Sequence, residues 1–209
     1  HDKNINDALS NIADIRIIWG GDNTIQELRK SPLKPRATEI AFANRFSLVV
    51  VDSDAYIRLE DKNKIAQYFY NDTFFNDQNA CTAPQFLIWY GKNVVEAKNI
   101  FWDILHKHVR AKYNISGVQA VNKLTQAYLL GADKPDIIIE TNDDNLIYRI
   151  QVSTLSSNLL GYKENSGYFF EYDCGDILEL KELCNDTRCQ TVSYIGNKSI
   201  LYPLLCSGI

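Results

Sequence analysis

The chain has 209 residues, of which 45% are hydrophobic and 23% are charged, and its formal net charge at pH 7 is -4. These values are typical of a globular protein with one domain or two small ones, and the mild acidity argues against a surface built for nucleic acid, which needs clustered Lys and Arg. No apolar stretch approaches the roughly 20 residues of a bilayer-spanning helix, so we expect no membrane span.

Short β-branched segments alternate along the chain with longer segments of helical period. Residues 15–19 predict a buried strand, after which a Gly20-Gly21 turn leads into a helix with capping-box spacing from Thr24 to Glu27. Residues 47–51 are rich in Val, which is typical of a strand covered on both faces. A helix is expected over residues 62–75, where apolar side chains recur at intervals of three and four.

The second half of the chain continues this alternation. A strand over 85–90 precedes helices over 95–113 and 118–130, and Gly131 is expected to be the C-cap of the latter. The later predicted elements are a hairpin of strands 136–140 and 146–152, the segment 167–174, a helix over 176–183 and a strand over 191–195. The pattern predicts one α/β domain over residues 1–209, with three layers and a mostly parallel sheet flanked by helices.

Cysteine is the residue type that most clearly suggests a reactive side chain. The chain has five cysteines, Cys81, Cys174, Cys184, Cys189 and Cys206. None of them stands in a CxxC arrangement, so we expect free thiols and no metal site. Cys81 differs from the others because it lies in a polar loop between a predicted helix and a predicted strand. Such loops are where reactive groups collect in α/β proteins. From the residues alone, Cys81 is either a nucleophile or an unreactive loop thiol.

Three segments carry a resemblance to a known family: Ala13–Asp22, Pro35–Ser47 and Asn76–Gln85. In order and separation they are similar to the catalytic domain of the aldehyde dehydrogenase superfamily. Within it, the chain most resembles the LuxC-type long-chain acyl-CoA reductases of bacterial bioluminescence. The resemblance covers most of residues 10–200; it is strong over 13–90 and poor over 140–209.

The resemblance implies roles for five residues. The nucleophilic Cys of the family falls on Cys81, and Asn79, where many relatives have Gln, would shape the loop or support an oxyanion. Gly20 and Gly21 fall where a strand-end glycine lets the nicotinamide approach the backbone, although an ordinary turn explains them equally well. Glu171 lies near the position at which relatives hold the nicotinamide ribose, with a structural carboxylate as the alternative.

One departure from the family bears on the reaction. Hydrolytic aldehyde dehydrogenases carry a water-activating Glu before the second strand, whereas residues 41–45 here contain no carboxylate. Glu39 is near but out of register, and we interpret it as a surface or structural group. The absence of this base suits a thioester reductase, whose covalent intermediate must survive until it is reduced.

The function that the resemblance implies is reduction of long-chain fatty acyl-CoA, or of an acyl-protein, to fatty aldehyde for bacterial luciferase. The resemblance implies that the reductant is NADPH, that no metal takes part, and that the reaction proceeds through an acyl thioester on Cys81. It further implies a cytoplasmic enzyme, oligomeric at full length, with an acyl-protein synthetase and an acyl-transferase as partners. The dinucleotide-binding domain of the superfamily precedes the first strand seen here, so we expect a catalytic-domain fragment that does not complete reduction alone.

Two alternatives remain open from the sequence. One is another CoA-acylating aldehyde dehydrogenase with a shorter acyl substrate. The other is a non-catalytic α/β module that presents the turn at residues 142–145 to a partner. A cleft next to Cys81 would favour an enzyme, whereas burial of Cys81 away from any cleft would favour the module.

Overall fold

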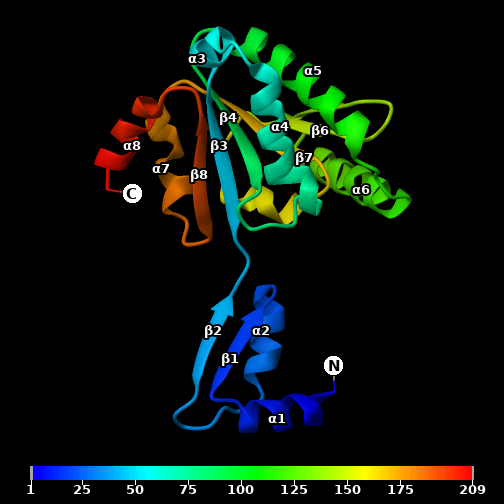
Figure 1. The fold of residues 1–209 in the computed structure, drawn as a ribbon, viewed down its shortest axis with the longest axis vertical. Coiled ribbons are helices and arrows are strands. Elements are labelled where there is room, and N and C mark those ends of the chain that lie inside the picture. The colour runs from blue at the N-terminus through cyan, green and yellow to red at the C-terminus, as the bar shows by residue number, and fades with distance from the viewer. Residues whose placement is uncertain (1, 209) are drawn as a thin grey trace. The chain divides into compact units, whose positions relative to one another are not determined.

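The computed structural model describes residues 2–208, which form two compact units, His1–Arg45 and Phe46–Ile209. The first unit contains two helices and two strands, α1 (Lys3–Ile12), β1 (Ile15–Trp19), α2 (Asp22–Arg29) and β2 (Thr38–Phe42). β1 and β2 are parallel and α2 connects them, as in a βαβ unit (Figure 1). Neither α1 nor β2 is among the elements that the sequence predicts.

Two details of the first unit correct the predictions from sequence. β1 is the expected strand, but it is buried on one face only: Ile18 is buried, whereas Ile15, Ile17 and Trp19 are each more than 60% exposed in this two-stranded sheet. α2 begins at Asp22 with Gly21 as its N-cap and no side-chain cap. The capping box from Thr24 to Glu27 is therefore wrong.

Arg16 connects the elements of the first unit. Its guanidinium donates to the Ser10 hydroxyl at 3.0 Å and to the Ser31 carbonyl at 2.7 Å, and it pairs with Glu39 on β2 at 2.5 Å. Glu39 also accepts from Arg29 at 2.7 Å. Hydrogen bonding from Arg29, and then from Arg16, holds the pKa of Glu39 below its ordinary value of 4.5. Glu39 is therefore structural, as the sequence indicates.

We expect Glu39→Gln to destabilise the first unit at neutral pH but not in acid. A carboxyl group with a lowered pKa in the folded state stabilises that state fully above 4.5, and this contribution is lost as the pH falls through the folded-state pKa. Hydrogen-exchange protection of the β1 and β2 amides should fall by roughly 1 to 2 kcal/mol at pH 7, and this deficit should disappear in acid, once the pH lies below the folded-state pKa of Glu39. Glu27→Gln, which breaks an exposed pair with Lys30, should leave protection unchanged at both pH values. A deficit of Glu39→Gln that persists in acid would contradict this account.

The second unit is built on a six-stranded sheet of order β5-β6-β7-β4-β3-β8. Its strands are β3 (Phe46–Asp52), β4 (Pro84–Tyr90), β5 (Ile138–Thr141), β6 (Tyr148–Gln151), β7 (Tyr168–Cys174) and β8 (Cys189–Ile195). The edge strand β5 runs antiparallel to β6, and the other neighbours are parallel. The predicted hairpin is thus confirmed as the antiparallel edge of a mostly parallel sheet.

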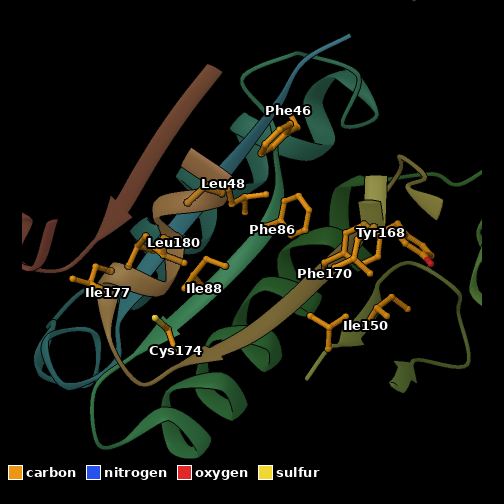
Figure 2. Packing of buried hydrophobic residues seen from close by; sticks show 14 of the residues in the cluster. Phe46, Leu48, Phe86, Ile88, Ile150, Tyr168, Phe170, Cys174, Ile177 and Leu180 are labelled. Atoms are coloured by element: carbon orange, nitrogen blue, oxygen red, sulfur yellow. The ribbon is translucent and has the colours of Figure 1, made fainter. Parts of the chain in front are cut away.

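Helices cover both faces of this sheet. One face buries Val49 and Trp89 against α3 (Ser53–Arg58), α4 (Lys62–Thr73) and α5 (Val94–Lys112), where Phe101 lies at the centre of an aromatic cluster. The other buries Leu48 and Ile88 (Figure 2). The elements that pack on this second face include α6 (Gly117–Asp133), η2 (Ser157–Tyr162), η3 (Ile177–Leu180), α7 (Lys181–Asn185), η4 (Lys198–Leu201) and α8 (Tyr202–Cys206). The three-layer α/β prediction is confirmed.

The boundaries of the predicted elements are largely confirmed in this unit. α4 continues as the short 3-10 helix η1 (Phe74–Asn76), close to the predicted end of that helix. α6 runs through Gly131 to Asp133, so the predicted C-cap at Gly131 is wrong. α3 and α8 are absent from the predicted elements. None of the helices within residues 2–208 combines the length and apolar character of a membrane span.

Candidate active site around Cys81

Cys81 lies in the loop that connects η1 to β4, and its side chain is half-buried. Because β3 and β4 are parallel, both strands begin at the same end of the sheet, and this loop lies at that end. The Ser47 hydroxyl, near the start of β3, donates to the Cys81 carbonyl at 2.7 Å. Among residues 2–208, no acceptor takes a hydrogen bond from the Cys81 backbone N–H. The loop therefore offers a thiol and an adjacent free donor.

The loop begins with two consecutive left-handed residues, Asp77 at φ 49° and Gln78 at φ 58°. Side chains other than glycine adopt this conformation at a cost, so surrounding contacts must hold it. The Gln78 side chain is 1% exposed and makes four hydrogen bonds. Its amide NH2 donates to the carbonyls of Pro84 at 2.9 Å and Tyr168 at 3.0 Å, and its oxygen accepts from the N–H groups of Gly167 at 2.9 Å and Tyr168 at 3.0 Å. Gln78 thereby fastens the loop to the start of β7.

A second corner of the chain, residues 165–167, lies against the Cys81 loop. The Asn165 amide donates to the Asn79 side chain at 2.7 Å, and the Ser166 N–H donates to the Asp77 carbonyl at 3.0 Å. Gly167 has φ 89°, and a Cβ at this position would lie 2.4 Å from the Leu146 carbonyl oxygen. Asn79, the residue that the resemblance assigns to loop shaping, therefore does contact a neighbouring loop through its side chain.

Lys123 binds the backbone of this corner, a role that the sequence does not predict. It is the only cation in α6, yet it is fully buried, and its ammonium group donates to the carbonyls of Asn145, Leu146 and Ser166 at 2.6, 3.1 and 2.7 Å. Burial lowers the pKa of Lys123 to about 7, although Asp144 and Glu164 oppose the shift. A lone Lys in a helix of otherwise uncharged turns is the signal that could have found it.

A cavity of about 470 Å³ opens beside the Cys81 loop. Thr82 and Pro84, one and three positions after Cys81, form one part of its wall. The rest of the wall is contributed by β3, α4 and β8, mostly through apolar and aromatic side chains: Val49, Ile65, Tyr68, Phe69, Asp72, Val192, Ser193, Tyr194 and Ile195. Burial raises the pKa of Asp72, the one acidic group of this wall. The Cys81 loop thus contributes Thr82 and Pro84 to the wall of a space that a reactant could enter, whereas Cys81 itself is not among the residues that line it.

Glu171, which the resemblance places near a nicotinamide ribose, lies in the interior. It is 1% exposed, and one carboxylate oxygen accepts from the indole N–H groups of Trp89 and Trp102, both at 2.7 Å. The other accepts from Arg149 at 2.8 Å. Because three donors inside the protein already occupy the carboxylate, this geometry favours the structural alternative.

Gly20 and Gly21 lie in the His1–Arg45 unit, where β1 ends and α2 begins. The Gly20 N–H donates to the Phe42 carbonyl at 3.2 Å, and a Cβ at Gly20 would lie 3.1 Å from the Thr24 methyl carbon. A close packing requirement therefore accounts for Gly20. Gly21 is the N-cap of α2 and adopts an extended conformation that does not require glycine.

The other four cysteines occupy different surroundings. Cys174 is buried, and burial raises its pKa to about 12; Cys184 and Cys189 are partly buried and pack against the core beside each other. Cys206 is exposed. Cys206 is therefore the thiol that competes most directly with Cys81 for a reagent in solution.

Comparison with known proteins places these observations in a family. The family model described as acyl-CoA reductase (LuxC) matches residues 1–111, more than half of the chain. The chain is 26% identical to the long-chain acyl-protein thioester reductase of Aliivibrio fischeri over 215 aligned residues, which include 100% of this chain and 42% of that protein. The chain thus spans less than half the length of this curated relative.

Solved structures show the same fold. The Staphylococcus aureus AldH structure superposes with a TM-score of 0.64 and 12% identity, over 99% of this chain and 47% of that one. Aldehyde dehydrogenase 21 of Physcomitrella patens superposes with a TM-score of 0.66 and 14% identity, over 98% and 44%. The structural likeness establishes an aldehyde dehydrogenase-like fold, and the family match goes further: the chain belongs to the acyl-CoA reductase (LuxC) family.

Proposed function

We propose that the chain forms the thiol-bearing part of a reductase that converts long-chain acyl thioesters to fatty aldehydes. The observation that carries the proposal is Cys81 itself: a half-buried thiol in a fixed loop, whose residues Thr82 and Pro84 line a cavity and whose Cys81 N–H meets no acceptor within residues 2–208. Nucleophilic cysteines need access for the substrate together with nearby donors for the oxyanion. The loop supplies both. The family match and the name of the Aliivibrio fischeri relative support this reading.

In the first step, Cys81 loses its thiol proton to solvent and attacks the acyl carbonyl of acyl-CoA or of an acyl-protein. The carbon–sulfur bond to the donor breaks, and the donor leaves as a thiolate. One thioester replaces another, so the exchange is close to balanced and needs no strong acid. The Cys81 N–H is a donor for the negative charge that develops on the carbonyl oxygen.

Reduction of the acyl group requires a hydride donor, and we propose NADPH for that role. When bound, NADPH supplies a hydride to an acyl carbonyl. Gly20 and Gly21 fit a dinucleotide by their place in the fold, since they follow the first strand of a parallel βαβ unit and begin its helix. Glu171 does not fit, because its oxygens are occupied. The role of Cys81 is to hold the acyl group and then to leave as a thiolate.

The wider setting follows from the family and belongs to the same proposal. We expect a cytoplasmic, oligomeric enzyme at full length, whose acyl groups come from an acyl-transferase and an acyl-protein synthetase and whose aldehyde serves a luciferase. A non-catalytic role for the turn at residues 142–145 receives less support. Asp144 pairs with His106 at 2.7 Å, and the Asn145 carbonyl accepts from Lys123, so this turn is tied to the interior.

Incubation with tetradecanoyl-CoA, followed by intact-mass measurement and peptide mapping, tests the proposal. We expect a single acyl adduct on Cys81 that hydroxylamine removes, as it removes thioesters. Prior treatment with iodoacetamide should prevent the adduct in protein for which peptide mapping shows that Cys81, and not only the exposed Cys206, is alkylated. No adduct, or one found on Cys206 or another cysteine instead, would contradict the assignment. A comparison with acetyl-CoA separates a long-chain enzyme from one with a shorter acyl substrate.

A further inference from the structure

Ser47 makes a contact with the Cys81 loop that the sequence pattern does not indicate. It is fully buried at the start of β3, and its hydroxyl donates to the Cys81 carbonyl at 2.7 Å. In the β3–β4 register Ser47 lies opposite Pro84, which has no backbone N–H to donate. The register shifts at this point in the pairing of β3 with both of its neighbours. At this irregular start of β3, the Ser47 side chain rather than a backbone hydrogen bond between strands therefore contacts the loop.

Two hydrogen bonds fix the peptide groups on either side of Cys81. The Ala83 N–H donates to the Ala80 carbonyl at 2.9 Å, and that carbonyl shares a planar peptide group with the Cys81 N–H. The Ser47 hydroxyl fixes the next peptide group through the Cys81 carbonyl. Because both planes are held, the two backbone dihedral angles of Cys81 are held as well. The first plane contains the unpaired Cys81 N–H, and the two dihedral angles set the direction of the Cα–Cβ bond that carries the thiol relative to both planes.

The earlier part of the loop is anchored independently of Ser47. Gln78 bonds to four backbone groups of β4 and the start of β7, and the Asn79 side chain is held by Asn165. Loss of the Ser47 hydroxyl would therefore release the Cys81 peptide without releasing the whole loop. The effect of such a change is local, which makes it measurable.

We propose that Ser47 is a positioning residue for Cys81: by holding the Cys81 carbonyl it fixes the backbone that carries the thiol relative to the Cys81 N–H, so that both face one position of the acyl carbonyl. Ser47 does not touch the substrate. Its contribution to acyl transfer rests on the proposed function, whereas its hold on the loop does not. A displacement of reacting groups by about 1 Å can lower a rate on the order of 100-fold, so a loosened Cys81 should react more slowly at saturation.

The test is Ser47→Ala, with Ser53→Ala as its matched control. Ser53 is equally buried, lies directly after the far end of β3, and its hydroxyl has no partner among residues 2–208. Two measurements are needed: hydrogen exchange over residues 79–83, where the reporting amide is the Ala83 N–H that bonds to the Ala80 carbonyl, and the saturation rate of Cys81 acylation by tetradecanoyl-CoA. Ser47→Ala should speed the exchange and slow the acylation by about tenfold each, with the half-saturating acyl-CoA concentration unchanged. Ser53→Ala should change neither.

The outcomes separate the two proposals. If wild-type protein is not acylated, the proposed function fails, and faster exchange at 79–83 in Ser47→Ala alone still establishes the hold on the loop. Wild-type exchange at 79–83 in Ser47→Ala would overturn the positioning role. So would equal losses of acylation in Ser47→Ala and Ser53→Ala, because a merely structural hydroxyl would act through overall stability in both.

Discussion

The Cys81→Ser variant is expected to lose acyl transfer from tetradecanoyl-CoA by at least about 1,000-fold. A cysteine side chain provides a few per cent of thiolate at neutral pH and is an intrinsically strong nucleophile, whereas a serine hydroxyl needs an adjacent base. Within residues 2–208, no hydrogen bond brings a histidine or carboxylate base to the side chain of residue 81. Single-turnover acylation followed by intact-mass measurement gives the rate.

The matched control is Cys206→Ser, which removes the exposed thiol and leaves the loop intact. It should acylate at the wild-type rate. Because Ser is almost isosteric with Cys, Cys81→Ser should also unfold at the same denaturant concentration as wild type. A Cys81→Ser protein that retains more than a tenth of the wild-type rate would place the nucleophile elsewhere.

The second large effect is expected at Glu171, on stability. Glu171→Ala should lower the free energy of unfolding of the Phe46–Ile209 unit by roughly 3 to 5 kcal/mol. The change leaves the Arg149 guanidinium, whose side chain is 17% exposed, without its buried partner and removes the acceptor of two buried indole N–H groups. Urea unfolding followed by far-ultraviolet circular dichroism measures the difference.

Glu140→Ala provides the comparison at the same arginine. Arg149 pairs with Glu140 at 2.5 Å, but the Glu140 side chain is 53% exposed. An exposed pair contributes little, so we expect a loss of only about 0 to 1 kcal/mol. Similar losses in the two variants would mean that burial does not distinguish the two pairs. A Glu171→Ala protein of wild-type stability would return Glu171 to consideration as a ligand-binding group.

The sequence predicts the central strands well because their signal is local. Residues 48–51 and 86–90 are continuous apolar runs, and both lie in buried strands of the sheet. β2 (Thr38–Phe42) escapes prediction because its five residues mix polar and apolar types and its pairing partner lies 23 positions earlier. β1 has a strand pattern, but exposure depends on how many strands join the sheet, which no local pattern encodes.

The site shows the same limit. Cys81 is recognisable from its polar loop and from the resemblance, both of which are properties of neighbouring residues. Gln78 and Lys123 hold that loop through partners about 90 and 43 positions away, so their roles emerge only when the chain is folded. Glu171 is ambiguous in the sequence for the same reason, since its indole donors come from β4 and α5. A reactive residue is easier to predict from sequence than the distant residues whose hydrogen bonds hold it in place.

The two indoles that donate to the Glu171 carboxylate are expected to differ in fluorescence from the third tryptophan of the chain. The chain has three tryptophans, and Trp89 and Trp102 are buried in the Phe46–Ile209 unit. Trp19 belongs to the His1–Arg45 unit and is 76% exposed. Iodide or acrylamide should therefore quench the long-wavelength emission of Trp19 and spare the blue-shifted emission of the other two. Unfolding of the Phe46–Ile209 unit should thus appear, without a label, as a red shift and a gain of quenching from Trp89 and Trp102, against a nearly constant signal from Trp19, which is already exposed.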